Sequence, residues 1–253
     1  MTKKSFLDQE KPLLTVMLEC ETSETVIGRV RNALCHGAEA FGLQTESLKE
    51  EYHNPETYKR IFTEMRDKPV YVTNYRFYHN TGKKDDELAD GLLELADCGA
   101  TLCDVMGDMF DKQPDELAVN GEAIEKQMRL IDELHSRGAE VIMSSHVREY
   151  TPAERVLEMA FEQKRRGADI VKIVTGAETM EQQIENLRIT HLLKKELGIP
   201  FLFLSCGESS IHRRLGMKLG CSMQLCVYEH DARSYVLQPL LSVSKAIRDE
   251  LGF

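Results

Sequence analysis

The sequence lacks the features that mark membrane-spanning and secreted proteins. No run approaches the ~18 consecutive apolar residues of a membrane span. The first residues contain no apolar segment of the kind found in a secretory signal. The seven cysteines are scattered, odd in number and never spaced as C-x-x-C, which is typical of reduced thiols. We therefore expect a cytoplasmic protein without a disulfide framework.

Positive charge is also scarce. The chain has 32 lysines and arginines against 42 aspartates and glutamates, which gives a formal net charge of −10. Nucleic-acid binding needs clustered positive charge, so this balance argues against a nucleic-acid partner. A small carboxylate needs only one or two cations, and a local basic pocket for such an anion is compatible with the composition.

Motifs for nucleotides and metals are missing as well. No G-x-G-x-x-G or G-x-x-x-x-G-K-[ST] pattern follows any strand-like run. The histidines never show H-x-H or H-E-x-x-H spacing. The sequence therefore predicts neither a nucleotide-binding fold nor a metal site.

What the chain does contain is a regular alternation of short apolar runs and longer amphipathic stretches. The strand-like runs are 13–18, 40–44, 69–74, 101–106, 140–145, 169–174, 200–205 and 221–227. Eight such units in 253 residues average about 32 residues each, the pace of a (β/α)8 barrel. A doubly wound open sheet is the alternative. Because no linker or shift in composition interrupts the pattern, we predict one α/β domain over residues 1–253, a (β/α)8 TIM barrel.

Lys172 stands in the middle of the run 169–174. The period of two places it on one face with Ile170 and Val174. A barrel interior is normally apolar, so an ammonium there is costly unless it is used or paired. A desolvated lysine has a lowered pKa, and its free amine can attack a ketone to form a Schiff base. The alternative is that Lys172 turns outward and its head reaches water.

His146 follows the preceding run, 140–145. Consecutive strands of a barrel are neighbours, so His146 and Lys172 could face one cavity. Histidine suits proton transfer near neutral pH, which a Schiff base needs for removal of the α proton. A histidine at a strand end can also be structural, but its pairing with an in-strand lysine favours a general acid and base.

Two motifs around these residues resemble the type I 3-dehydroquinate dehydratase family. They are residues 141–152, VIMSSHVREYTP, and residues 167–174, GADIVKIV. The resemblance implies a (β/α)8 lyase of the shikimate pathway that converts 3-dehydroquinate to 3-dehydroshikimate. It implies Lys172 as the iminium lysine and His146 as the general acid and base. It also implies no cofactor beyond the covalent imine, and it allows a homodimer.

The resemblance extends to residues that would bind the substrate, a small keto acid. The arginine that binds its carboxylate falls on Arg213 when counted from the later glycines, and on Arg214 when counted from Cys206 and Gly207. A bidentate guanidinium–carboxylate pair explains why an arginine is wanted, and Arg213 is preferred. The serine and glutamine of a mobile lid fall on Ser234 and Gln238. The arginine after the third strand falls on Arg76.

The first half of the chain departs from the family pattern. Gly42 and Gln44 stand where the family has E-x-R, whose side chains contact ring hydroxyls. Asn80 replaces the glutamate that lies near the catalytic histidine. Sites built to bond a hydroxyl discriminate strongly, so exchanging these partners should change substrate preference. We therefore expect weak activity on 3-dehydroquinate, with Gln44 and Asn80 among the substrate contacts.

Two other function classes fit the same residues. A class I aldolase shares the barrel lysine but breaks a carbon–carbon bond. A ligand-binding barrel could keep the lysine and have lost turnover, although nothing structural requires both Lys172 and His146.

Overall fold

The structure, a computed structural model, describes residues 3–208 and 210–252. Within these ranges eight parallel strands follow the order β7-β6-β5-β4-β3-β2-β1-β8. Because β1 pairs with both β2 and β8, the sheet curls into a nearly closed barrel. The strands are β1 (Leu13–Leu18), β2 (Ala40–Gln44), β3 (Val70–Thr73), β4 (Leu102–Met106), β5 (Glu140–His146), β6 (Ile170–Ala177), β7 (Phe201–Gly207) and β8 (Met223–Cys226). The predicted TIM barrel is confirmed, and the open sheet is excluded.

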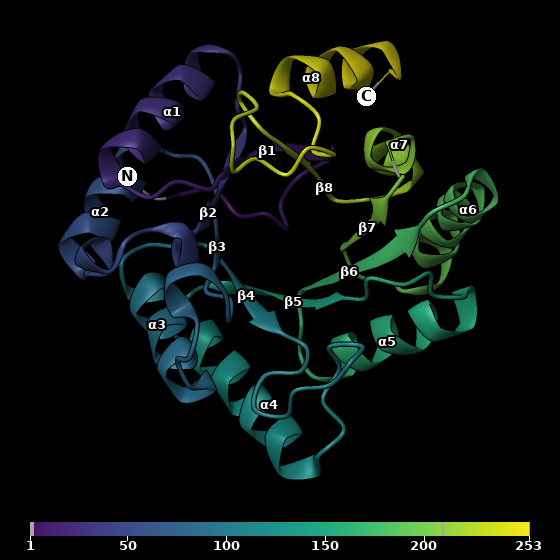
Figure 1. Cartoon of the computed structure of the whole chain (residues 1–253), viewed down its shortest axis with the longest axis horizontal. Coiled ribbons are helices and arrows are strands. Elements are labelled where there is room, and N and C mark those ends of the chain that lie inside the picture. The colour runs from purple at the N-terminus through teal and green to yellow at the C-terminus, as the bar shows by residue number, and fades with distance from the viewer. Residues whose placement is uncertain (1–2, 209, 253) are drawn as a thin grey trace.

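The α-helices form a ring around the strands (Figure 1). They are α1 (Ser23–Cys35), α2 (Pro55–Glu64), α3 (Asp85–Asp97), α4 (Gly121–Ser136), α5 (Ala153–Arg165), α6 (Met180–Glu196), α7 (His212–Leu219) and α8 (Leu241–Glu250). Short 3-10 turns, η1 (Thr45–Ser47), η2 (Glu50–Tyr52) and η3 (Tyr78–Asn80), shape the loops after β2 and β3. None of the helices in the described ranges has the length and apolar character that crossing a bilayer requires.

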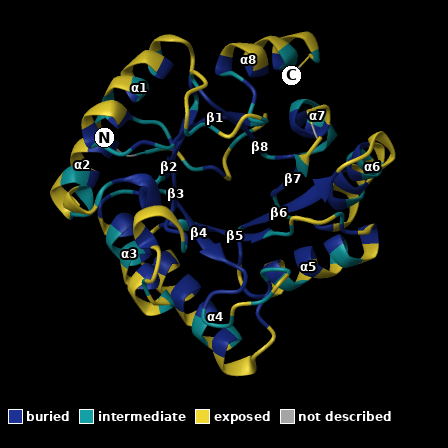
Figure 2. Ribbon diagram, in the orientation of Figure 1, coloured by how far each residue is buried: buried dark blue, intermediate teal, exposed yellow. Residues whose placement is uncertain are grey.

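The strands alternate between two apolar environments, as a period of two requires. On β1, Leu14 and Val16 pack with Val26 of α1, in the layer between sheet and helices. Leu13 and Met17 belong instead to a second cluster. Figure 2 shows the consequence: the strands are buried, and the helices are exposed on their outer sides.

Strands β6 and β7 are longer than predicted. They pair from Val171–Phe201 to Ala177–Gly207, beyond the predicted ends at residues 174 and 205. Strand β5 pairs with β6 in a register that sets Ser144 beside Lys172 and His146 beside Val174. This register brings the lysine and the histidine to the same end of the barrel, where active sites of this fold lie.

Candidate active site

A cavity with a volume of about 320 Å³ lies at the carboxyl ends of the strands. Its lining includes polar groups from most of the strand ends and the loops that follow them. These are Glu19, Gln44, Thr73, Tyr75, Tyr78, His146, Arg148, Lys172, Cys206, Arg213, Tyr235 and Gln238. Both residues predicted to carry the chemistry, Lys172 and His146, therefore border one cavity.

Lys172 points into the barrel and is only 5% exposed. Its ammonium donates hydrogen bonds to Tyr75 Oη at 2.7 Å, Tyr71 Oη at 3.0 Å and Asp104 Oδ2 at 3.1 Å. These three acceptors match the three donors of an ammonium group. The inward orientation predicted from the strand period is confirmed, and the outward alternative is wrong.

Asp104 makes this lysine one half of a buried ion pair. Its carboxylate also accepts hydrogen bonds from Tyr71, Tyr75 and Ser144. Burial, together with the charge of Asp104, raises the pKa of both tyrosines well above the usual value, so their hydroxyls stay protonated donors. The nucleophile that attacks a carbonyl is the free amine, so Lys172 must give up a proton before it reacts.

The sequence interpretation missed Asp104 and the two tyrosines, although a signal for Asp104 was present. Asp104 is an ionisable residue inside an apolar strand run, the same feature that singled out Lys172. Tyr71 and Tyr75 carry no comparable signal, because an aromatic residue in or near a strand is ordinary.

His146 ends β5 and lies edge-on to the ring of Tyr75, with 5.4 Å between ring centroids. Its Nδ1 lies 2.9 Å from Glu116 Oε2, and its backbone N–H donates to the same oxygen at 2.7 Å. Nε2 has no hydrogen-bond partner within the part of the chain that the structure describes. A carboxylate on Nδ1 fixes the tautomer and orientation of an imidazole, leaving Nε2 to exchange protons.

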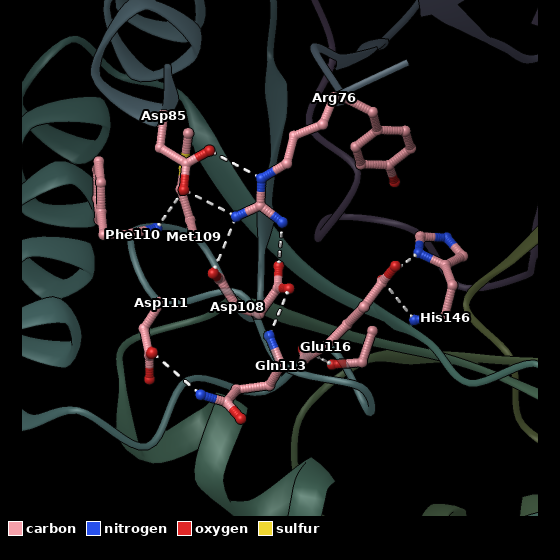
Figure 3. Close-up of polar contacts among 12 residues, drawn as sticks. Arg76, Asp85, Asp108, Met109, Phe110, Asp111, Gln113, Glu116 and His146 are labelled. Carbon is pink, nitrogen blue, oxygen red and sulfur yellow. Dashed lines mark hydrogen bonds and ion pairs between the residues drawn. The ribbon is translucent and has the colours of Figure 1, made fainter. Parts of the chain in front are cut away.

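Glu116 belongs to the loop between β4 and α4, and Figure 3 shows it reaching the His146 ring. Although burial acts to raise its pKa, the hydrogen bond and charge of His146 lower it overall. The loop holds Glu116 at φ +50°, a conformation that residues other than glycine rarely adopt. Its carbonyl accepts a hydrogen bond from Ser145 Oγ at 2.7 Å. Nothing in the sequence pattern pointed to this glutamate.

Asn80, predicted as a substrate contact, is fully buried away from the cavity lining. Its amide donates to Asn74 Oδ1 and to the carbonyl of Tyr75, and it accepts from Lys83. Asn80 therefore braces the loop after β3.

Arg76 is also absent from the cavity lining, and Figure 3 shows its guanidinium directed at Asp85 and Asp108. Its guanidinium forms ion pairs with Asp85 at 2.8 Å and Asp108 at 2.7 Å. The placement of Arg76 in the substrate site is therefore corrected. Tyr75, the residue before Arg76, lies next to Lys172 instead.

Arg213 lines the cavity and is 5% exposed. Its Nε donates to the carbonyl of Ser205 at 2.6 Å, and its guanidinium carbon lies 4.7 Å from the ring centroid of Tyr235. Burial lowers its pKa, and no carboxylate in the described ranges forms an ion pair with it. Arg214 instead donates to the carbonyl of Ser210 and does not line the cavity. Between the two candidates, only Arg213 can meet an anion there.

The other three predicted substrate contacts differ in where they lie. Gln44 at the end of β2 and Gln238 in the loop before α8 both line the cavity. Ser234 is half-buried, bonds to Asp231 and borders only a small adjoining recess. In the described residues no group of three or more histidine, cysteine or carboxylate side chains is arranged to hold a metal ion.

Comparisons with known proteins agree on one family. Residues 14–232 match the family model for Type I 3-dehydroquinase. A 3-dehydroquinate dehydratase from Alkaliphilus oremlandii (strain OhILAs) is 36% identical over 87 residues, so the match spans 34% of each chain.

Solved structures show the same fold over nearly the whole chain. The 3-dehydroquinate dehydratase from Geobacillus kaustophilus HTA426 superposes with a TM-score of 0.81 at 16% identity, covering 97% of this chain and 93% of the other. The type I enzyme from Clostridium difficile, with covalently modified comenic acid, also gives 0.81 at 16% identity, covering 97% and 94%.

Proposed function

Because the chain belongs to the type I 3-dehydroquinase family, we propose that it dehydrates a cyclic β-hydroxy keto acid through a Schiff base on Lys172. The reaction of the family is the dehydration of 3-dehydroquinate to 3-dehydroshikimate, and 3-dehydroquinate is the first substrate to test. One observation carries the proposal: Lys172, His146 and Arg213 border the same cavity. Arg213 is buried there and pairs with no carboxylate in the described ranges.

The reaction begins at the ion pair of Lys172 and Asp104. Asp104, 3.1 Å from Nζ, is placed to take the proton that Lys172 must lose. The free amine adds to the ketone carbon to give a carbinolamine, whose hydroxyl takes back the proton held by Asp104 and leaves as water, so that an iminium remains. Arg213 holds the substrate carboxylate, which keeps the carbonyl over the lysine.

His146 carries out the elimination. Its Nε2 removes the proton α to the iminium carbon, and the electron pair forms an enamine. The enamine then expels the β-hydroxyl, to which the protonated His146 returns a proton, so that water leaves. Hydrolysis of the resulting iminium releases an enone and regenerates Lys172. Glu116 stabilises the imidazolium that forms between the two proton transfers.

The imine itself is the electron sink of this reaction. The proposed chemistry therefore requires neither an organic cofactor nor a metal ion.

A test of the proposal traps the iminium. The native chain is incubated with 3-dehydroquinate and borohydride, and the expected result is a reduced adduct on the peptide containing Lys172. Lys172→Ala should give no adduct, whereas a control variant at the exposed Lys195, Lys195→Ala, should be labelled normally. An adduct on another lysine, with Lys172→Ala still active, would overturn the assignment.

Product analysis separates the proposed lyase from the two alternative functions. Elimination gives a conjugated enone that absorbs in the ultraviolet, whereas retro-aldol cleavage gives two fragments. An adduct without either product would indicate a binding barrel that has lost turnover.

A further inference from the structure

Glu19 is the only acidic side chain among the described residues that line the cavity. It follows β1 directly, one residue beyond the pair formed by Leu18 and Leu43, and it shares the cavity wall with Gln44. Its side chain is half-buried, and its Oε1 accepts a hydrogen bond from Tyr78 at 2.5 Å. Its Oε2 has no hydrogen-bond or ion-pair partner in the described part of the chain.

Arg213 and Glu19 place opposite charges on the wall of the cavity, which Lys172 and Arg148 also line. Arg213 offers a buried guanidinium with no carboxylate partner, and Glu19 offers a carboxylate with one open oxygen. A keto acid in this cavity is attracted to Arg213 through its carboxylate and repelled by Glu19 at that group. Glu19 can instead accept a hydrogen bond from a donor group elsewhere on the ligand.

The packing between β1 and β2 explains why the acidic side chain in this wall, Glu19, follows β1 and does not come from β2. Met17 pairs in register with Gly42, and its thioether occupies the space beside that glycine. A Cβ built on Gly42 would lie 2.3 Å from Met17 Sδ and 3.0 Å from the ring of Tyr71. No side chain from position 42 can enter the wall without moving Met17, and the next inward position along β1 is Glu19.

We propose that Glu19 determines substrate specificity by accepting a hydrogen bond from a ring hydroxyl of the substrate. The substrate class is a cyclic keto acid with a hydroxyl on the part of the ring away from its carboxylate. This inference rests on the proposed function, because that function places a keto acid in the cavity.

The test compares 3-dehydroquinate with analogues that each lack one ring hydroxyl that the elimination leaves in place. Glu19→Gln should lower kcat/KM for the hydroxylated compound about 10-fold, and Glu19→Ala about 100-fold, since bonds to charged acceptors are the stronger ones. For one deoxy analogue both variants should change kcat/KM less than about 3-fold. The matched control is Glu24→Gln, which should behave like the native chain. Glu24 is an exposed glutamate on α1 whose carboxylate pairs with Arg60 of α2.

Each outcome of this test decides between the two proposals. An equal loss on every substrate would show that Glu19 is only structural and would overturn the specificity role. If borohydride labels Lys172 of the native chain while Glu19→Gln leaves all selectivity ratios unchanged, the proposed function stands and this inference falls. If the native chain gives neither adduct nor turnover with any of these compounds, both fall together.

Discussion

The rim of the barrel has two regions whose functional side chains come from different parts of the chain. Around β5 and β6, Lys172 and His146 project from the strands themselves, so the register of the sheet fixes where they lie. Around β1 to β3, most of the polar groups that line the cavity come from strand ends and loops, such as Glu19 and Tyr75. A strand residue can be placed from sequence because its neighbours are set by pairing. A loop carboxylate can be supplied by a different loop with little change to the fold.

Asp104 links the two regions, because it pairs with Lys172 and accepts from the tyrosines at positions 71 and 75. Asp104→Asn should lower the free energy of unfolding by about 3–5 kcal/mol, since it leaves the buried ammonium without a counter-charge. Urea denaturation at pH 7 measures this loss. In the double variant with Lys172→Met, most of the loss should disappear. If the single and double variants are equally destabilised, the ion pair is not the cause.

Glu116 tests whether a carboxylate from a loop supports the strand-borne histidine. Glu116→Gln should lower kcat about 10- to 100-fold with little change in KM, because the imidazolium of His146 loses a charge-assisted hydrogen bond. Glu116→Asp should recover part of the loss. The control is its neighbour Asp115, whose carboxylate pairs with Arg155 on the surface, and Asp115→Asn should leave kcat within about 2-fold. A normal kcat in Glu116→Gln would mean that His146 needs no carboxylate partner.

Gly42 and Gln44 test whether the family pattern can be put back into the wall. From sequence alone, Gly42→Glu with Gln44→Arg is expected to raise kcat/KM for 3-dehydroquinate. The packing of Met17 changes this expectation, because the new side chain would push Met17 into the cavity. The double variant should instead lose about 1–3 kcal/mol of stability and gain no activity. Adding Met17→Ala should restore stability and allow kcat/KM to rise. A rise in kcat/KM without that third change would show that Met17 can move aside more easily than its packing indicates.

The sequence predicted the barrel, the strand runs and the placement of Lys172 and His146 at one cavity, because each depends on periodicity and pairing within the strands. It placed Arg76 wrongly, because the guanidinium pairs with Asp85 while Tyr75 is the residue of this segment that contacts Lys172. It could not identify Glu116, whose contact with His146 depends on a loop held at positive φ. Asp104 could have been found, because an acid within an apolar strand run is as unusual as a lysine there.

Glu46 gives the smallest expected effect and tests the β1–β3 region through pH. It is fully buried, accepts hydrogen bonds from Thr73 Oγ1 at 2.9 and 3.0 Å, and accepts from the backbone N–H of Tyr75 at 3.4 Å. Burial raises its pKa from 4.5 to about 7, so the native state binds this proton more tightly than the unfolded chain does. Its protonation therefore favours the folded state, and stability contributed by this proton is lost as the pH rises from about 4.5 through 7.

Glu46→Gln keeps the hydrogen-bond acceptor and removes the titration. The variant should be more stable than the native chain by about 1–3 kcal/mol at pH 8, and the difference should vanish below about pH 4, where the carboxyl is protonated in both the folded and the unfolded chain. Thermal unfolding at both pH values measures this, with Glu50→Gln, an exposed glutamate in η2, as the control that should show no such trend. Because Glu46 holds the backbone of Tyr75, and Tyr75 contacts Lys172, a pH-independent difference would mean that the carboxylate stays charged and stabilises this wall as an ion.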